Sequence, residues 1–257
     1  LDTASSLISN NEDRLGKKLW SENSKGDLIE VNCYNNGYDE AVAIADEIEK
    51  DLSNHNSLNQ ISILVRAAFQ TREFEDRFIK INLPYRVIGG LKFYDRAEIK
   101  DAICYIRIIH QENDDLAFER IINTPKRSIG DATLKEIHKI AKQKNINLEQ
   151  ASLLYCEQEN PNGKTILSLK KIITDIQSWR KLSKEISHYE LTERVMDESG
   201  YTQMLMNEKT PEADSKLENL KELILSMKNY SNLQDFLENI SLQTSIDEDW
   251  NGEKINL

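Results

Sequence analysis

The chain has little cysteine, glycine or proline and no long apolar run. Its 257 residues include 3 Cys, 9 Gly and 4 Pro, and the scarcity of glycine and proline favours helix. Cys33, Cys104 and Cys156 are far apart and form no Cys-x-x-Cys pair. This pattern excludes a disulfide framework and is typical of reduced thiols in a cytosolic protein. No 18 consecutive residues are apolar and no signal peptide is visible, so we expect a cytoplasmic protein without a membrane partner.

The sequence also lacks the common catalytic motifs. It contains no GxxxxGK[ST] loop for phosphates, no HExxH and no GxSxG. Its histidines are isolated from one another and are better explained as ordinary surface or core side chains: His55, His110, His138 and His188. We therefore predict no catalytic residue, no metal site and no cofactor within this chain.

Basic residues are outnumbered. The 33 Lys and Arg against 44 Asp and Glu give a net charge of −11, which argues against bulk electrostatic wrapping of nucleic acid but leaves room for a local basic patch. The chain starts at Leu1 without methionine and stops at Leu257 within GEKINL, which looks like a strand. We interpret it as a fragment of a longer protein.

The first third of the chain alternates strand and helix patterns. LIEVNCY at 28–34 alternates apolar and polar residues as a half-buried strand does. ISILV at 61–65 is a continuous apolar run, typical of a central parallel strand that is covered on both faces. Helical spacing covers 38–52 and 69–81, and a third strand is expected at 85–88. This order predicts a parallel sheet with right-handed crossovers, too short to be a complete α/β domain.

From Asp95 onward the sequence predicts helices only. Apolar stripes at helical spacing define the expected buried faces, the first at Ile99, Ala102, Ile103, Ile106 and Ile109 and the longest at Ile166, Leu169, Ile172, Ile173, Ile176, Trp179, Leu182 and Ile186. We expect Asn113 to cap a short helix at 116–122, a capping box at 133–136 to open the next helix, and the longest helix to span 165–187. The predicted fold class is mainly α with an α/β part.

Two adjacent glycines stand where the pattern changes. Gly89 and Gly90 follow the strand at 85–88, and glycine adopts positive φ at little cost. We predict an inter-domain hinge that also includes Phe93, Tyr94 and Arg96. The two aromatic rings could pack in the hinge or stack on bases, and packing is the better interpretation.

TPKRSIGDAT at 124–133 lies between two helix patterns and resembles the hairpin of a helix-hairpin-helix unit. In such a loop, N–H groups at the start of the next helix can bind a DNA phosphate. Six basic and two acidic residues lie between 126 and 144. The candidate DNA contacts are Thr124, Lys126, Arg127, Ser128, Ile129, Gly130 and Thr133. The alternative is a structural turn before a solvated basic helix face, and spacing alone favours that alternative.

Two arginines flank the end of the strand at 61–65 and the start of the next helix. Arg66 and Arg72 are candidate ligand contacts, because ligands bind at the carboxyl ends of strands in open α/β sheets. Salt-bridged surface arginines are an equally good interpretation.

Four segments carry a family resemblance: RLGKKLW, IGGLKFYDRAEIKDAICYIRII, INTPKRSIGDATL and SGYTQMLMNEKTPEADSKLENLKEL. In this order, over residues 12–257, they resemble the UvrD/PcrA/Rep family of superfamily I DNA helicases. The resemblance implies that residues 1–95, with 249–257 returning as a strand, form part of the RecA-like subdomain 2A. It implies that residues 96–248 form the all-helical subdomain 2B.

The resemblance also implies a parent protein that uses ATP and Mg²⁺, bound outside this chain, to move 3′ to 5′ on single-stranded DNA. Subdomain 2B would touch the duplex junction and swivel, and repair proteins are possible partners. Arg66 and Arg72 would lie on the single-stranded side, and the chain alone would not hydrolyse ATP. Two residues depart from the family pattern: Ser128 replaces the first glycine of the loop, and Ala68 replaces an asparagine.

Two other readings stay open at this point. One is a non-enzymatic helical module that binds protein partners through its acidic surface or autoinhibits. The other is a nuclease-fused relative of the RecB type, which a C-terminal domain outside this chain would distinguish.

Overall fold

The computed structural model describes residues 1–11, 20, 22, 26–53, 57–158, 163–210, 212–245 and 252–257. They form two compact units, Leu1–Asn35 and Asn36–Leu257. In the described part of the first unit, the regular structure is the helix α1, Asp2–Ile8. Most residues of the RLGKKLW segment lie outside the described ranges, as do residues 249–251 of the predicted returning strand.

The strand predicted at 28–34 is wrong. These residues have no regular structure, and the side chains of Leu28 and Val31 are 94% and 85% exposed. A strand needs a neighbour for its backbone hydrogen bonds, and no described residue provides one here. The alternation of apolar and polar residues is therefore real in the sequence, but it does not produce a strand by itself.

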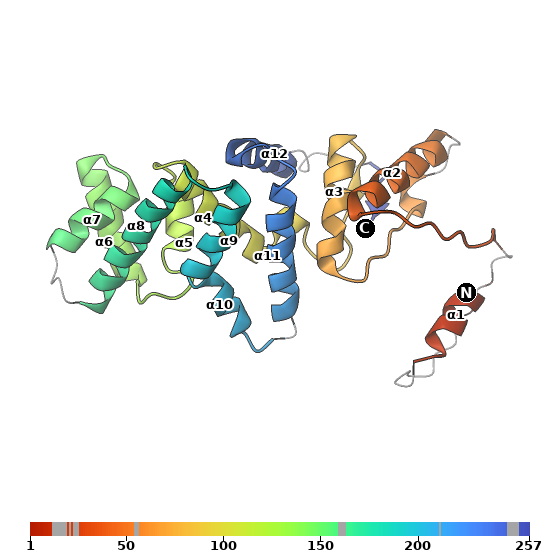
Figure 1. Ribbon diagram of the computed structural model, residues 1–257, viewed down its shortest axis with the longest axis horizontal. Coiled ribbons are helices and arrows are strands. Elements are labelled where there is room, and N and C mark those ends of the chain that lie inside the picture. The colour runs from red at the N-terminus through yellow and green to blue at the C-terminus, as the bar shows by residue number, and fades with distance from the viewer. Residues whose placement is uncertain are drawn as a thin grey trace. The chain divides into compact units, whose positions relative to one another are not determined.

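The second unit begins with a small α/β part (Figure 1). It contains α2 (Gly37–Ser53), a 3₁₀ turn (Ala68–Gln70), α3 (Thr71–Lys80), β1 (Tyr85–Arg86) and β2 (Ile255–Asn256). β2 pairs in parallel with β1, with Tyr85 opposite Ile255, and a single bridge from Asn256 to Ser62 joins the segment 61–65 on its other side. The expected strand in GEKINL is thus present and lies between two segments from early in the chain.

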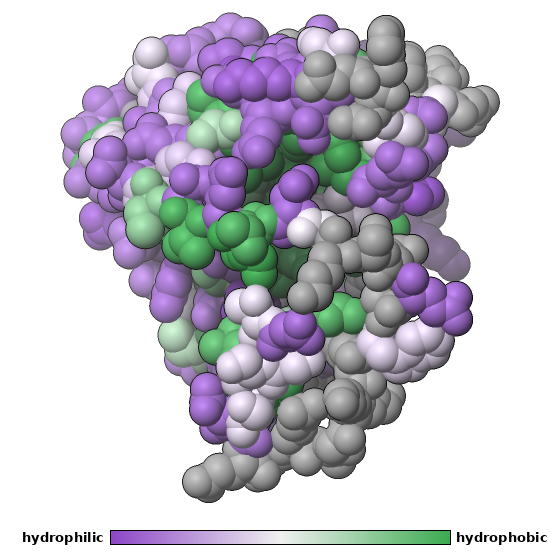
Figure 2. Space-filling view, turned by 90° about the vertical axis from the view of Figure 1, so that its right-hand side faces the viewer, coloured by the Kyte–Doolittle hydropathy of each residue, from purple (hydrophilic) through white to green (hydrophobic). Residues whose placement is uncertain are grey.

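The segment 61–65 differs from the central strand that its apolar run predicts. Ile61, Ile63 and Val65 are half-buried against the core, but Leu64 on the opposite face is 95% exposed. Among the described residues only one face of the sheet is covered, so the second face remains open. Figure 2 shows apolar surface between polar regions on the side of the molecule where α2 and α3 lie.

The rest of the second unit is helical, as predicted (Figure 1). Its helices are α4 (Ala97–His110), α5 (Asp115–Ile121), α6 (Asp131–Lys144), α7 (Leu148–Gln158), α8 (Lys164–Leu182), α9 (His188–Glu198), α10 (Tyr201–Met206), α11 (Ala213–Met227) and α12 (Leu233–Ser245). All the stripe residues predicted for α4 are buried, as are those of α8 from Ile166 to Trp179. The fold class is therefore confirmed as mainly α with an α/β part.

Several helix ends differ from prediction. Asp114, not Asn113, caps α5 by accepting a hydrogen bond from the N–H of Ala117 at 3.0 Å. α6 begins at Asp131 after Gly130, so the expected capping box at Thr133 does not form. α8 ends at Leu182 and not at 187, because the next residues form a turn. The sequence did not predict α10, because its six residues are too few to show a clear apolar period.

Two separate hydrophobic cores organise the second unit. The larger core runs from Phe93 to Ile240 and contains Trp179, whose ring centroid lies 6.2 Å from that of Tyr105. The smaller core joins α2, α3 and the sheet, and it includes Phe78, Tyr85 and Ile255. Along the chain, residues up to Val87 pack in the smaller core and residues from Phe93 to Ile240 pack in the larger one. Gly89 and Gly90 lie between these two segments.

Candidate nucleic-acid interface

The loop between α5 and α6 is held by side chains on both sides. The side-chain carbonyl of Asn123 accepts hydrogen bonds from the N–H groups of Arg127 at 2.7 Å and Ile129 at 3.4 Å. Ile129 is buried, and the hydroxyl of Thr165 at the start of α8 donates to the carbonyl of Ser128 at 3.0 Å. The loop therefore has a defined shape that α8 helps to fix.

Ser128 carries the unusual backbone conformation of this loop. Its φ is 62°, in the left-handed region, whereas Gly130 has an ordinary φ of −94°. A side chain in the left-handed region costs roughly 1–2 kcal/mol. The position that needs glycine-like freedom is thus the one where the resemblance places a glycine, and the surrounding contacts must offset the cost of serine there.

Arg127 points into the protein. Its guanidinium donates to the carbonyls of Ile121 at 2.8 Å and Ser199 at 3.1 Å, and to the hydroxyl of Tyr105 at 2.7 Å. It also donates to the carbonyls of Ile122 and Pro125, both at 3.2 Å. These bonds engage both terminal nitrogens of the guanidinium within the protein, so the expectation that Arg127 contacts DNA gives way to a structural role.

Lys126 is the exposed cation of the loop. It lies four residues before Gly130, the N-cap of α6, which has no side chain to bond the first N–H groups of the helix. Open N–H groups at a helix start are suitable partners for phosphate. Asp131 adds one carboxylate in the same turn, and Thr133 is half-buried. Of the predicted loop contacts, the exposed side chain of Lys126 and Gly130 at the open start of α6 are the ones placed to meet a ligand.

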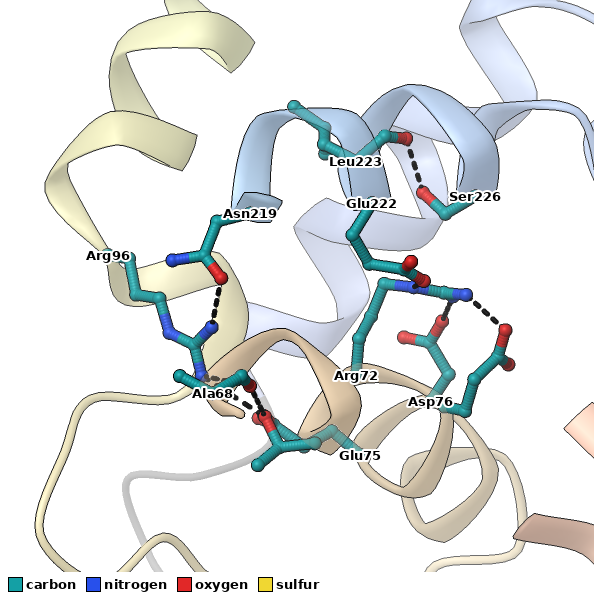
Figure 3. Close-up of polar contacts among 11 residues, drawn as sticks. Ala68, Arg72, Glu75, Asp76, Arg96, Asn219, Glu222, Leu223 and Ser226 are labelled. Atoms are coloured by element: carbon teal, nitrogen blue, oxygen red, sulfur yellow. Dashed lines mark hydrogen bonds and ion pairs between the residues drawn. The ribbon is translucent and has the colours of Figure 1, made fainter. Parts of the chain in front are cut away.

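Arg72 is buried in an ion-pair cluster between α3 and α11 (Figure 3). It is 3% exposed, and its guanidinium contacts the carboxylates of Glu222 at 2.6 Å, Asp76 at 2.5 Å and Glu73. Burial by itself would lower the pKa of Arg72, but Asp76 and the other carboxylates hold the pKa above its ordinary value. The expectation that Arg72 contacts single-stranded DNA is therefore corrected: it joins α3 to the helical part.

Arg66, by contrast, is exposed. The side-chain carbonyl of Gln70 accepts hydrogen bonds from the N–H groups of Arg66 at 3.0 Å and Ala67 at 2.8 Å, which fixes the backbone beside it. Arg66 and Arg72 thus have different environments, and of the two only Arg66 is exposed.

Comparisons with known proteins show the family of the chain. The model of the UvrD-like helicase C-terminal domain matches residues 1–257. The chain belongs to the UvrD-like helicase C-terminal domain family. A probable DNA helicase II homolog of Rickettsia conorii is 41% identical over 244 residues, which cover 94% of this chain and 37% of the relative.

More distant relatives carry the same kind of name. DNA helicase II of Escherichia coli K12 is 35% identical over 231 residues, covering 90% of this chain and 32% of the relative. The ATP-dependent DNA helicase PcrA of Staphylococcus aureus Mu50 is 35% identical over 264 residues, covering 96% of this chain and 35% of the relative. The chain spans about a third of the length of the curated relatives it matches.

In this UvrD-like domain the segment predicted as a hinge, from Gly89 to Arg96, is the joint between the α/β part and the helical part. Only its first residue has an unusual backbone conformation, and its aromatic residues are buried. Gly89 has a φ of 81°, which favours glycine, although a side chain at this position would have space around it. Gly90 does not have a positive φ. Phe93 and Tyr94 are buried, and their rings pack edge to face with 5.1 Å between the ring centroids. Neither ring is available to stack on a base.

Arg96, the N-cap residue of α4, holds this joint together (Figure 3). Its guanidinium donates to the side-chain carbonyl of Asn219 at 2.9 Å, to the carbonyl of Ala68 at 3.0 Å and to the hydroxyl of Thr71 at 3.1 Å. A further bond reaches the carbonyl of Leu91 at 3.3 Å. Burial lowers the pKa of Arg96, although nearby Glu75 opposes the change. One side chain thus connects the 3₁₀ turn, α3, α4 and α11.

Glu75 is a residue of this joint that sequence reasoning missed. It is buried, and it accepts from the hydroxyls of Thr71 at 2.6 Å and Tyr85 at 3.2 Å and from the N–H of Phe93 at 3.2 Å. Burial raises the pKa of the Glu75 carboxyl, opposed by these hydrogen bonds. One sequence signal could have indicated its burial: Glu75 lies between Phe74 and Phe78 in the sequence, and those two residues mark the apolar face of α3. Asn219 and Glu222 on α11 gave no comparable signal.

Neither a metal site nor a membrane span is found in the described part of the UvrD-like domain. Across those residues, no three His, Cys, Asp or Glu side chains cluster so as to hold a metal ion. No helix there is both long and apolar enough to cross a membrane.

Proposed function

We propose that this chain is part of an ATP-dependent DNA helicase that moves 3′ to 5′ on single-stranded DNA. Residues 1–95 and 249–257 are assigned to the RecA-like subdomain 2A, and residues 96–248 to the helical subdomain 2B. The two hydrophobic cores support this division to within a few residues, because Val87 packs against the smaller core, which contains Leu257, and the larger begins at Phe93. The names of the relatives, DNA helicase II and ATP-dependent DNA helicase PcrA, are the basis for the proposed activity.

The role of the chain within that helicase is contact with duplex DNA at the junction. The observation that carries it is the exposed Lys126 close to the uncapped start of α6. The oxygens of a DNA phosphate accept hydrogen bonds from lysine ammonium groups and from backbone N–H groups at the start of a helix. Lys126 and the start of α6 supply these two kinds of donor. Arg66 is the candidate for the single-stranded side.

ATP and Mg²⁺ are assigned to the parent protein outside this chain. The sequence has no phosphate loop of the GxxxxGK[ST] kind, and the described residues offer no cluster of metal ligands. These residues therefore do not fit a nucleotide site, and no step of ATP hydrolysis is derived from them. A cytoplasmic location and DNA-repair partners belong to the same proposal.

A strand-displacement assay with the parent protein tests the activity. With ATP and Mg²⁺, a duplex with a 3′ single-stranded tail is expected to be unwound, whereas a matched duplex with a 5′ tail is not. The isolated chain is expected to hydrolyse no ATP with or without DNA. Unwinding from the 5′ tail would contradict the direction. DNA-stimulated hydrolysis by the pure chain would contradict the assignment of the nucleotide site.

A further inference from the structure

Tyr105 is the buried residue on which the loop between α5 and α6 rests. It lies on α4 with its side chain fully buried, and its ring packs near Trp179 and Tyr201 at centroid distances of 6.2 and 6.1 Å. Its hydroxyl donates to the carbonyl of Thr124 at 2.6 Å and accepts from the guanidinium of Arg127 at 2.7 Å. One oxygen atom therefore binds both ends of the segment that contains Lys126.

Arg127 extends this support to α9. It links the hydroxyl of Tyr105 to the carbonyl of Ser199, at the end of α9, and to the carbonyl of Ile121, at the end of α5. Burial raises the pKa of Tyr105 even though Arg127 opposes the change, so the hydroxyl keeps the proton that it donates to Thr124. The half-buried arginine thus connects the loop to α4, α5 and α9.

The support is needed because the loop holds an unfavourable backbone conformation. Ser128 has φ 62°, and such residues persist only where surrounding contacts determine the conformation. Without the bond from Tyr105, the two sides of the segment from Thr124 to Arg127 lose their common anchor. The loop would then be fixed less firmly before a ligand binds, because only the contacts of Asn123, Thr165 and Arg127 remain.

We infer that Tyr105 is a positioning residue for duplex binding, which holds the loop at 124–130 in its DNA-binding shape through Thr124 and Arg127. The inference rests on the proposed function, in which this loop contacts a DNA phosphate. Tyr105 itself does not touch DNA. Its effect on binding arises because a pre-organised site loses less conformational entropy when it binds.

The test is duplex binding by Tyr105→Phe across a salt series, with Tyr201→Phe as the matched control. Both changes remove one hydroxyl from the same core, since the Tyr201 hydroxyl donates to Asp101 at 2.8 Å and not to the loop. Tyr105→Phe removes both hydrogen bonds of this hydroxyl to the loop and is expected to weaken duplex affinity about tenfold, with an unchanged slope of log affinity against log salt. Tyr201→Phe is expected to bind within about twofold of the wild type, because it keeps the ring and removes only the hydroxyl that donates to Asp101.

A second variant keeps the test decisive if Tyr105→Phe folds poorly. Arg127→Lys keeps the positive charge but cannot make the same five bonds, so affinity is expected to fall about tenfold with an unchanged slope. Full affinity in Arg127→Lys or in folded Tyr105→Phe would overturn the inference, provided that Lys126→Ala weakens binding. If Lys126→Ala also binds like the wild type, the proposed DNA contact itself fails, and the inference fails with it.

Discussion

Replacing Arg72 by alanine is expected to destabilise the chain by about 3–5 kcal/mol, the range for breaking a buried ion pair from one side. The guanidinium is 3% exposed and contacts Glu73, Asp76 and Glu222. Its removal leaves three carboxylates close together at the joint between α3 and α11. Chemical denaturation followed by circular dichroism gives the free energy of unfolding that checks this value.

Arg194→Ala is the matched control for this prediction. Arg194 pairs with Glu198 at 2.6 Å, but its side chain is 56% exposed. An exposed pair of this kind contributes less than about 1 kcal/mol because water competes for both charges. If the two variants lose similar stability, Arg72 does not hold the joint together.

Arg96→Ala is expected to cost about 3 kcal/mol, since buried acceptors left without a donor cost about 1–3 kcal/mol each and partial relaxation reduces the sum. The affected acceptors are on Asn219, Thr71 and Ala68. Because all of them lie at the joint, hydrogen exchange should show loss of protection near Phe93 before the core around Trp179 is affected.

The exposed Arg86, which donates to the side chain of Asn256 at 2.7 Å, provides the control for this second variant. Arg86→Ala is expected to cost no more than about 1 kcal/mol, as for a typical net hydrogen bond. Uniform loss of protection through both cores in Arg96→Ala would contradict a role confined to the joint.

The helical faces could be predicted from the sequence because they depend on local periodicity. Ile99 and Ile106 are buried as the spacing indicates, and the same holds for Ile166 and Trp179. A helix buries the stripe that its own sequence defines, whichever partner covers it. The strand at 28–34 failed for the opposite reason, since a strand requires hydrogen bonds from another segment of chain.

The candidate site could be located from the sequence, but the roles of its arginines could not. Arg72 and Arg127 have the expected positions at a helix start and in a loop, yet both guanidinium groups are used inside the protein. Their partners include Glu222 and Ser199, which lie far away in sequence. No local pattern shows whether a long polar side chain will find a buried acceptor after folding.

Ser128 shows how far a departure from the family pattern can be interpreted. The sequence indicates only that a glycine is replaced. The structure adds that this residue keeps the left-handed backbone conformation and that its carbonyl accepts from Thr165. The loop therefore keeps its shape without the glycine, which leaves Lys126 as the side chain whose charge should decide binding.

Duplex DNA binding by Lys126→Ala across a salt series tests the central claim most directly. Loss of one phosphate contact is expected to lower the steepness of log affinity against log salt by about 0.9 and to weaken binding at low salt. Lys144→Ala is the matched control, because Lys144 is an exposed lysine at the last residue of α6, about 20 Å along the helix axis from its first residue, Asp131. The account predicts a reduced slope for Lys126→Ala and the wild-type slope for Lys144→Ala. Identical slopes for the wild type and Lys126→Ala would contradict it and would favour a helical module that binds protein partners.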